Sequence, residues 1–170
     1  MSVGGRQPSQ RPGLYTEAER KRRDETVWTL VQGILAPLQF LVFLISLGLV
    51  MRTLMTGEGA AIAHVSILIK TLVLYTIMIT GAIWEKTVFG QYLFAPAFFW
   101  EDVVSFVVIA LHTIYLAGLT MGFMTDIQLF AITLAAYATY VVNATQFILK
   151  LRAARLQMDA EAFSAMEVVQ

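Results

Sequence analysis

Three carboxylates and a lysine lie at the adjoining ends of two apolar segments. Glu85 and Lys86 end one segment, and Glu101 and Asp102 open the next, directly after the aromatic residues 98–100. A carboxyl group that is partly removed from water beside aromatic rings, and near a second carboxylate, binds its proton more tightly. Such a group suits general acid catalysis near neutral pH. An ordinary charged rim is the alternative that the spacing leaves open.

Two further ionisable residues lie within apolar segments. If these segments cross a bilayer, a rise of about 1.5 Å per residue puts His112 ~15 Å and Lys70 ~20 Å from the ends that carry the carboxylates. An ionisable residue at such depth is functional by default. The alternatives are snorkelling for Lys70 and, for His112, a neutral ring bonded to a neighbouring helix. His64 lies near the opposite surface and is interpreted as structural.

The side chains that bind metals are scarce. The chain has no cysteine and only 2 histidines, which is no ligand set for a catalytic zinc or iron ion. A haem held by two histidines would need both rings at one depth, whereas His64 and His112 differ by ~9 Å. The sequence therefore predicts no metal site of the protein's own.

Four apolar stretches must position these groups. Apolar types make up 58% and charged types 14% of the 170 residues, which is too lipophilic for a soluble domain of this size. Each stretch approaches or exceeds the ~20 residues that cross a hydrocarbon core. We predict an all-α, polytopic membrane protein built as a four-transmembrane-helix bundle. The spans are 28–50, 60–83, 103–122 and 127–149; they form a membrane domain, 16–151, between a disordered cytoplasmic tail, 1–15, and a cytoplasmic C-terminal tail, 152–170.

The positive charges predict the orientation of this bundle. Of the 12 Lys and Arg residues, Lys70 lies inside a span and Arg52 lies on one side. The others lie on the opposite side: Arg6, Arg11, Arg20, Lys21, Arg22, Arg23, Lys86, Lys150, Arg152 and Arg155. Because loops rich in Lys and Arg stay inside, we expect both termini and the 84–102 loop in the cytoplasm.

Each predicted span carries its polar residues on one helix face, since side chains three, four, seven or eleven positions apart align. Polar groups that faced lipid would go unsatisfied, so we expect the four faces to turn toward a common interior. Gln39 and Asn143 on these faces are candidates for substrate binding, although such residues more often join membrane helices. The faces comprise Trp28, Gln32, Gln39 and Ser46; Ser66, Lys70 and Gly81; Glu101, Ser105, His112 and Tyr115; and Thr139, Asn143, Gln146 and Lys150.

Long strings of the chain resemble one enzyme family. They are TLVQGILAPLQFLVFLISLGLV, KTLVLYTIMITGAIWEK, VFGQYLFAPAFFWEDV and AAYATYVVNATQFILKLRAARL. From about Trp28 to Leu156 the chain is similar to the 3-vinyl bacteriochlorophyllide hydratases of phototrophic bacteria. The resemblance implies a membrane-bound hydro-lyase that adds water across the C-3 vinyl group of a chlorophyllide and gives a 3-(1-hydroxyethyl) group.

The resemblance also implies the partners of the chain. They are a chlorophyllide-type tetrapyrrole, water and the lipid bilayer, with no nucleic acid; contact with other enzymes of pigment biosynthesis is left open. No cofactor is implied, because the magnesium belongs to the substrate macrocycle. The location implied is the bacterial inner membrane or an intracytoplasmic photosynthetic membrane.

The chemistry of hydration then suggests roles for the candidate residues. An alkene needs a proton donor and a water acceptor, and a large flat pigment needs apolar walls with a few polar anchors. The catalytic candidates are Glu101, Asp102, Glu85 and His112, and the substrate-binding candidates are Lys70, Lys86, Trp100, Asn143 and Gln39. His112 or His64 is a candidate axial ligand of the pigment magnesium. A pigment-binding or assembly subunit without catalytic activity is the alternative function.

Overall fold

Five helices make up the structure, a computed structural model that describes residues 13–168. They are α1 (Glu17–Glu25), α2 (Val27–Thr56), α3 (Ala60–Phe89), α4 (Phe99–Met121) and α5 (Asp126–Val168). Within the described residues there is no strand. Four of the helices, α2 to α5, are long and apolar enough to cross a membrane. The all-α, four-span prediction is therefore confirmed.

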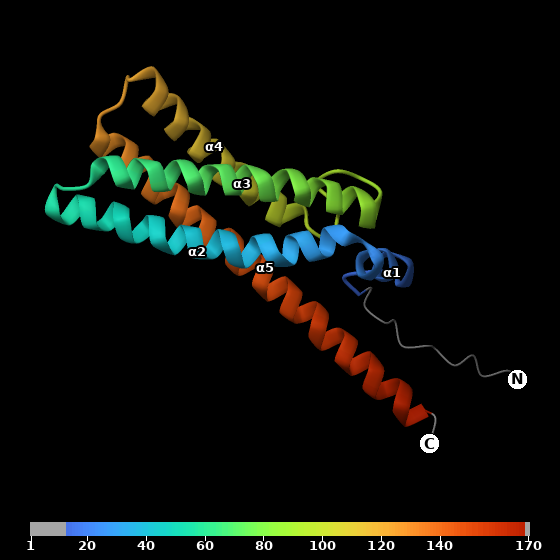
Figure 1. Cartoon of the computed structure of the whole chain (residues 1–170). Coiled ribbons are helices and arrows are strands. Elements are labelled where there is room, and N and C mark those ends of the chain that lie inside the picture. The colour runs from blue at the N-terminus through green and yellow to red at the C-terminus, as the bar shows by residue number, and fades with distance from the viewer. Residues whose placement is uncertain (1–12, 169–170) are drawn as a thin grey trace, which may run out of the picture.

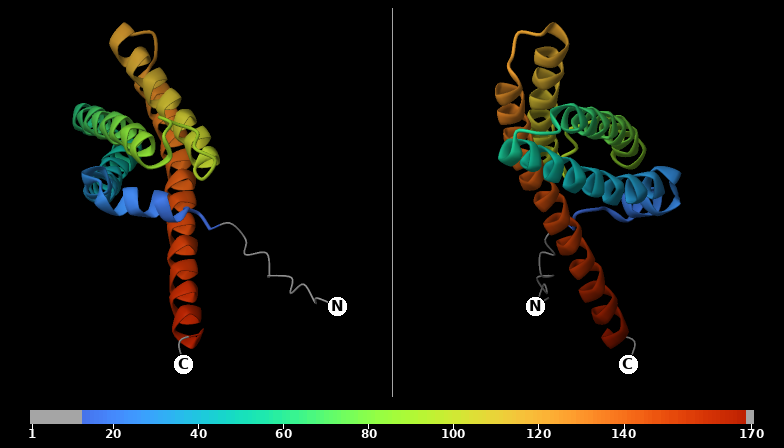
Figure 2. Two further views of the ribbon diagram at one scale, coloured as in Figure 1. Left: turned by 90° about the vertical axis from the view of Figure 1, so that its right-hand side faces the viewer. Right: turned by 60° about the vertical axis from the view of Figure 1, so that its left-hand side comes forward.

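The four long helices form two hairpins that cross each other (Figures 1 and 2). Helix α2 packs along α3, and α4 packs along α5, whereas the two hairpins touch over much shorter segments. Polar pairs fix the register within the first hairpin: Gln32 Nε2 donates to Thr80 Oγ1 over 2.7 Å, and the Ser46 and Ser66 hydroxyls are 2.7 Å apart. The first hairpin thus has its own internal hydrogen bonds.

The connections define two ends of the bundle. Residues 57–59 and 122–125 connect the helices of each hairpin at the short-loop end, and residues 90–98 join the hairpins at the long-loop end. The turn after α2 needs glycine, because Gly57 and Gly59 have φ values of 74° and 85°, a left-handed region that only glycine enters without strain. Helix α1 and the C-terminal part of α5 lie toward the long-loop end (Figure 1).

An apolar core fills the crossing of the hairpins. It consists of Phe43, Leu74, Val108, Ala136, Tyr137 and Tyr140. Aromatic rings dominate it: the Phe43 ring lies 5.3 Å from that of Tyr137 and 5.0 Å from that of Tyr140 between centroids. Because lipid tails are as apolar as these side chains, close packing rather than hydrophobic exclusion holds such helices together.

The helices run past the predicted spans. Helix α2 continues to Thr56 and α3 to Phe89, while α4 already begins at Phe99. Helix α5 continues without a break to Val168, through most of the segment predicted as a C-terminal tail. Apolar composition predicts only the membrane-crossing part of a helix, whereas the backbone bonds of a helix persist into polar sequence until a residue such as Gly90 ends it. Of the predicted N-terminal tail, residues 1–12 lie outside the described residues, and Tyr15 is buried.

Candidate active site

The long-loop end brings the end of α3 against the start of α4. Gly90, with a φ of 86°, ends α3, and the connecting segment 91–98 then returns to the membrane domain. Three carboxylates meet in this region: Glu85 from α3, and Glu101 and Asp102 from the first turn of α4. All three side chains are buried. The predicted grouping of these carboxylates is therefore present, although they fall into two separate arrangements.

Glu85 and Asp102 form a pair. Their carboxyl groups hydrogen bond to each other, and the two residues are 5% and 4% exposed. Two carboxyl groups can share a hydrogen bond only if one of them carries a proton, because an ionised carboxylate is acceptor-only. Two neighbouring negative charges also repel each other, which opposes ionisation of both carboxyl groups at once. A pair that holds one proton and one negative charge would have the equipment of a general acid and a general base.

The connecting segment covers this pair with its backbone. The Phe94 N–H donates to Asp102 Oδ2 over 2.7 Å, and the Ala95 N–H donates to Glu85 Oε2 over 3.2 Å. Phe94 has a φ of 57° and is the one non-glycine residue with positive φ among residues 13–168. Its left-handed backbone aims the N–H at the carboxylate, so the loop and the pair hold each other in place.

Glu101 is engaged elsewhere. Its Oε2 accepts a bond of 2.6 Å from Lys150 Nζ, and the same ammonium donates to the Ala97 carbonyl. The backbone carbonyl of Glu101 accepts from Asn143 Nδ2 over 2.8 Å and from the Ser105 hydroxyl over 2.8 Å. Glu101 is thus a neutralised carboxylate that ties α4 to α5, and Asn143 supports its backbone.

The lysine in this region is Lys150, and the prediction that Lys86 joins the carboxylates is wrong. Lys86 follows Glu85 directly and so points about 100° away around α3. Its Nζ donates to the Gly90 carbonyl over 2.7 Å and lies 5.4 Å from the centroid of the Tyr92 ring. Trp100 likewise points outward, with 68% of its surface exposed.

A cluster of buried aromatic rings packs at the same end of the bundle as the carboxylates. The Phe98 ring is 5.5 Å from Trp84 and 5.9 Å from Phe147 between centroids. Tyr15, ahead of α1, contacts Phe98 at 6.4 Å and stacks on Phe89 at 5.8 Å. No catalytic signal in the sequence marks Tyr15, which directly precedes the Thr16 N-cap, a position where an apolar side chain often packs. Packed aromatic rings therefore fill the space around Phe98 at the long-loop end.

A second polar group lies at the hairpin crossing and contains Lys70, His112 and Gln39. All three are buried, Lys70 and His112 at 0% and 1% exposure, so the prediction that they face the interior is confirmed. Lys70 Nζ lies 3.9 Å from the centroid of the Tyr140 ring. Lys70 Nζ, His112 Nε2 and Gln39 Oε1 have no hydrogen-bond partner in the described part of the chain. About 15 Å of α4 separates this group from Asp102.

His112 has a defined tautomer when its ring is neutral. Its Nδ1 lies 2.8 Å from the Val108 carbonyl, and a carbonyl only accepts, so Nδ1 carries the hydrogen. Nε2 then presents a lone pair to the interior. This nitrogen has the chemistry of a proton acceptor or of a ligand to a metal.

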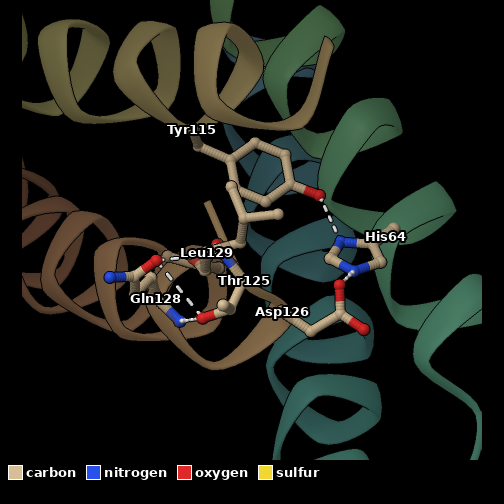
Figure 3. Close-up of polar contacts among 7 residues, drawn as sticks. His64, Tyr115, Thr125, Asp126, Gln128 and Leu129 are labelled. Carbon is tan, nitrogen blue, oxygen red and sulfur yellow. Dashed lines mark hydrogen bonds and ion pairs between the residues drawn. The ribbon is translucent and has the colours of Figure 1, made fainter. Parts of the chain in front are cut away.

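His64 forms a hydrogen-bonded chain at the short-loop end (Figure 3). Its Nδ1 lies 2.8 Å from the Tyr115 hydroxyl, and its Nε2 lies 3.2 Å from Asp126 Oδ1. The ring also stacks on Phe130 at 4.8 Å. Because both ring nitrogens have partners, His64 has none left for a pigment magnesium, in contrast to His112.

Nearby, Thr125 and Gln128 cap the N-terminus of α5 (Figure 3). The Thr125 N–H donates to Gln128 Oε1 over 2.9 Å, and the Gln128 N–H lies 3.4 Å from Thr125 Oγ1. This reciprocal cap fixes the start of α5. It also positions Asp126 beside His64. The short-loop end thus has a structural polar network.

The described residues contain no group of three His, Cys, Asp or Glu side chains that would hold a metal ion. An apolar groove of about 170 Å³ lies on the first hairpin and is lined by Val42, Ile45, Ser66 and Ile69. Pockets for molecules of cofactor size are typically ~300 to 1,000 Å³. This groove is too small for a tetrapyrrole, and the carboxylates do not line it.

Comparison with known proteins adds the family. Residues 15–153 match the family model described as 2-vinyl bacteriochlorophyllide hydratase. A protein of that name from Cereibacter sphaeroides is 72% identical over 147 residues, covering 86% of this chain and 91% of the relative. One from Rhodobacter capsulatus is 70% identical over 151 residues, covering 89% and 88%. No solved structure matches the chain significantly. The matched region contains every carboxylate, lysine and histidine of the two polar groups, and the chain belongs to the 2-vinyl bacteriochlorophyllide hydratase family.

Proposed function

We propose that this protein adds water across the vinyl group of a bacteriochlorophyllide-type pigment and gives a 1-hydroxyethyl group. The observation that carries this proposal is the 72% identity to a relative named for that reaction. The relative's name gives the vinyl position as 2, whereas we number it C-3, because two numbering schemes of the ring are in use. The product would be an intermediate of bacteriochlorophyll biosynthesis.

The Glu85–Asp102 pair fits the first step. The proton that the pair shares is transferred to the terminal vinyl carbon, and the carbon–carbon double bond supplies the electrons for the new C–H bond. The positive charge remains on the inner vinyl carbon, where the conjugated macrocycle delocalises it. The pair is left with both carboxylates ionised, which is the arrangement that attracts a proton most strongly.

The second step restores the pair. Water attacks the inner carbon, and one of its hydrogens returns to the ionised carboxylates. The sum is the addition of one water molecule, with no change in the oxidation state of the enzyme. The chemistry therefore needs no redox cofactor, and the magnesium in this scheme belongs to the pigment.

This scheme changes the roles expected from sequence. Glu101, first expected to share the acid–base work with Asp102, is neutralised by Lys150 at 2.6 Å, so we assign it a structural role. Glu85 takes its place in the acid–base pair. His112 keeps a free nitrogen, but its distance of about 15 Å along α4 from Asp102 argues against a part in the same proton transfer.

The test is conversion of pigment by membranes that contain this chain. We expect incubation with a vinyl chlorophyllide to shift the long-wavelength absorbance band to the blue, since the vinyl group leaves the conjugated system. Mass spectrometry should find the mass of one added water. Membranes without the chain are the control. Tight pigment binding with no change in mass would instead support a carrier or assembly subunit.

We also propose that the long-loop end faces the cytoplasm of a phototrophic bacterium, in its inner or intracytoplasmic membrane. Ten of the 12 Lys and Arg residues lie on that side of the four spans, and Arg52 lies on the other. Reporter fusions test this orientation. A reporter active only in the periplasm should work in the loop near Glu58 and fail at Gln170; the opposite result would reverse the topology.

A further inference from the structure

An exposed aromatic surface lies directly beside the proton-sharing pair. It consists of Phe94, Phe99, Trp100 and Phe106, which we call the aromatic face. The Phe94 ring stacks on Phe106, with centroids 5.3 Å apart and planes at 12°, and lies 5.7 Å from Phe99. Phe99 contacts Trp100 at 5.4 Å. Four rings thus form one continuous surface at the long-loop end, and all four are exposed.

Phe94 joins this surface to the acid–base pair. Its ring belongs to the aromatic face, while its backbone N–H bonds Asp102 Oδ2 over 2.7 Å. The residue has a φ of 57°, a conformation that is unfavourable for a bulky side chain and natural for glycine. Local strain of this kind persists where the surroundings impose it, often at a ligand site. A single residue, Phe94, therefore connects the aromatic face to the Glu85–Asp102 pair.

The interior offers no comparable surface for a flat pigment. The crossing of the hairpins is filled by the packed core around Phe43, Tyr137 and Tyr140. On the other side of the carboxylates, Phe98 is buried among Trp84, Phe89 and Phe147. A macrocycle would have to separate the hairpins to enter either region. On the aromatic face it needs only to displace lipid.

A cation contacts the connecting segment that carries Phe94. Lys86 Nζ lies 5.4 Å from the centroid of the Tyr92 ring, and Tyr92 is two residues before Phe94 in the connecting segment. Lys86 forms no ion pair in the described part of the chain; its bond goes to the Gly90 carbonyl. A ligand with a flat apolar body and a single carboxylate would match this combination of rings and charge.

We propose that the tetrapyrrole substrate docks from the lipid phase with its macrocycle on the aromatic face and its propionate on Lys86. This inference rests on the proposed hydratase function and adds where the pigment binds. The vinyl group then meets the Glu85–Asp102 pair at the Phe94–Ala95 backbone. Displacement of these two N–H bonds exposes the shared proton to the alkene.

Direct pigment binding tests the aromatic face. Magnesium chlorophyllide with its vinyl group is titrated against the Glu85→Gln variant, which separates binding from turnover, and quenching of tryptophan fluorescence reports the complex. Phe94→Gly is then added to this variant, and Trp100→Ala is added after it. Each ring removed should weaken pigment binding roughly five- to tenfold. Because Trp100→Ala removes a fluorescent side chain, binding by that variant is measured from pigment absorbance. Phe94→Gly suits the backbone at this position, so the fold should persist.

The control is Phe123→Ala, which removes an equally exposed ring at the short-loop end. Exposed aromatic residues are common at membrane surfaces, so an exposed ring alone does not indicate a pigment site. Because Phe123 lies outside the aromatic face, this variant should bind pigment normally. Equal losses in all three variants, or no loss at Phe94 and Trp100, would overturn the docking site. Turnover by the wild-type protein is measured in parallel, so that failure of the docking site is distinguished from failure of the proposed function.

The propionate contact has its own comparison. Lys86→Met should weaken binding of the free acid about tenfold and should not change binding of the pigment methyl ester, which lacks the negative charge. Equal effects on the acid and the ester would show that Lys86 acts only on the loop through Gly90. That result would remove the charge contact from the proposal.

Discussion

Replacing Glu85 by glutamine, or Asp102 by asparagine, is expected to lower vinyl hydration by about 10²- to 10⁴-fold, the usual effect of removing a general acid or base. The fold should be unaffected. An amide has nearly the shape of a protonated carboxyl group and can donate to the remaining carboxylate, so each variant keeps a hydrogen bond and one negative charge. It lacks only the proton that can be transferred.

The measurement is hydroxyethyl pigment formed per unit of membrane-inserted protein. Asp159→Asn, the same change at an exposed position of α5, is the matched control and should retain full activity. Glu101→Gln is the informative comparison, because sequence alone ranked Glu101 with Asp102. Rates within about tenfold of wild type in both pair variants would exclude the pair as the acid and direct attention to Glu101 and His112.

Replacing Lys150 by methionine is expected to destabilise the bundle by about 3 kcal/mol. The change leaves the buried Glu101 carboxylate without its partner at 2.6 Å, and breaking a buried ion pair typically costs ~3 to 5 kcal/mol. The lower end applies, because the Lys150 side chain keeps some exposure. The free energy of unfolding is measured by denaturant titration in mixed micelles.

Two variants control this result. Lys21→Met breaks an exposed pair with Glu25, at 3.9 Å, and should change the free energy of unfolding by no more than ~0.5 kcal/mol. The double variant Lys150→Met, Glu101→Gln removes the unpaired charge and should recover part of the lost stability. If Lys150→Met is no more destabilising than Lys21→Met, the pair does not tie α4 to α5.

Helical periodicity was enough to predict which faces are buried. Lys70 and His112 were placed inside from their own helices alone, because a lipid-facing charge at that depth is strongly unfavourable. The same periodicity aligned Lys150 with Asn143, and both residues contact Glu101 in the structure. A side chain's direction around its own helix is thus a local property that sequence retains.

Contacts between hairpins could not be predicted in this way. Whether Glu85 meets Glu101 or Asp102 depends on how residues 90–98 set one hairpin against the other, and no periodicity extends through that loop. The positive φ of Phe94 has no sequence signal either, since glycine or asparagine is the usual residue there. Adjacency of Lys86 to Glu85 in sequence does not bring its side chain to the carboxylates, because a helix turns neighbouring residues apart.

The crossing of the two hairpins has a consequence for biogenesis. Glu85 is delivered to the membrane with the first hairpin and Asp102 with the second, so a partly inserted chain contains neither the pair nor its shared proton. Residues 90–98 act as a tether that keeps the two halves at high effective concentration. In the proposed mechanism the acid–base pair therefore forms only when the second hairpin has joined the first.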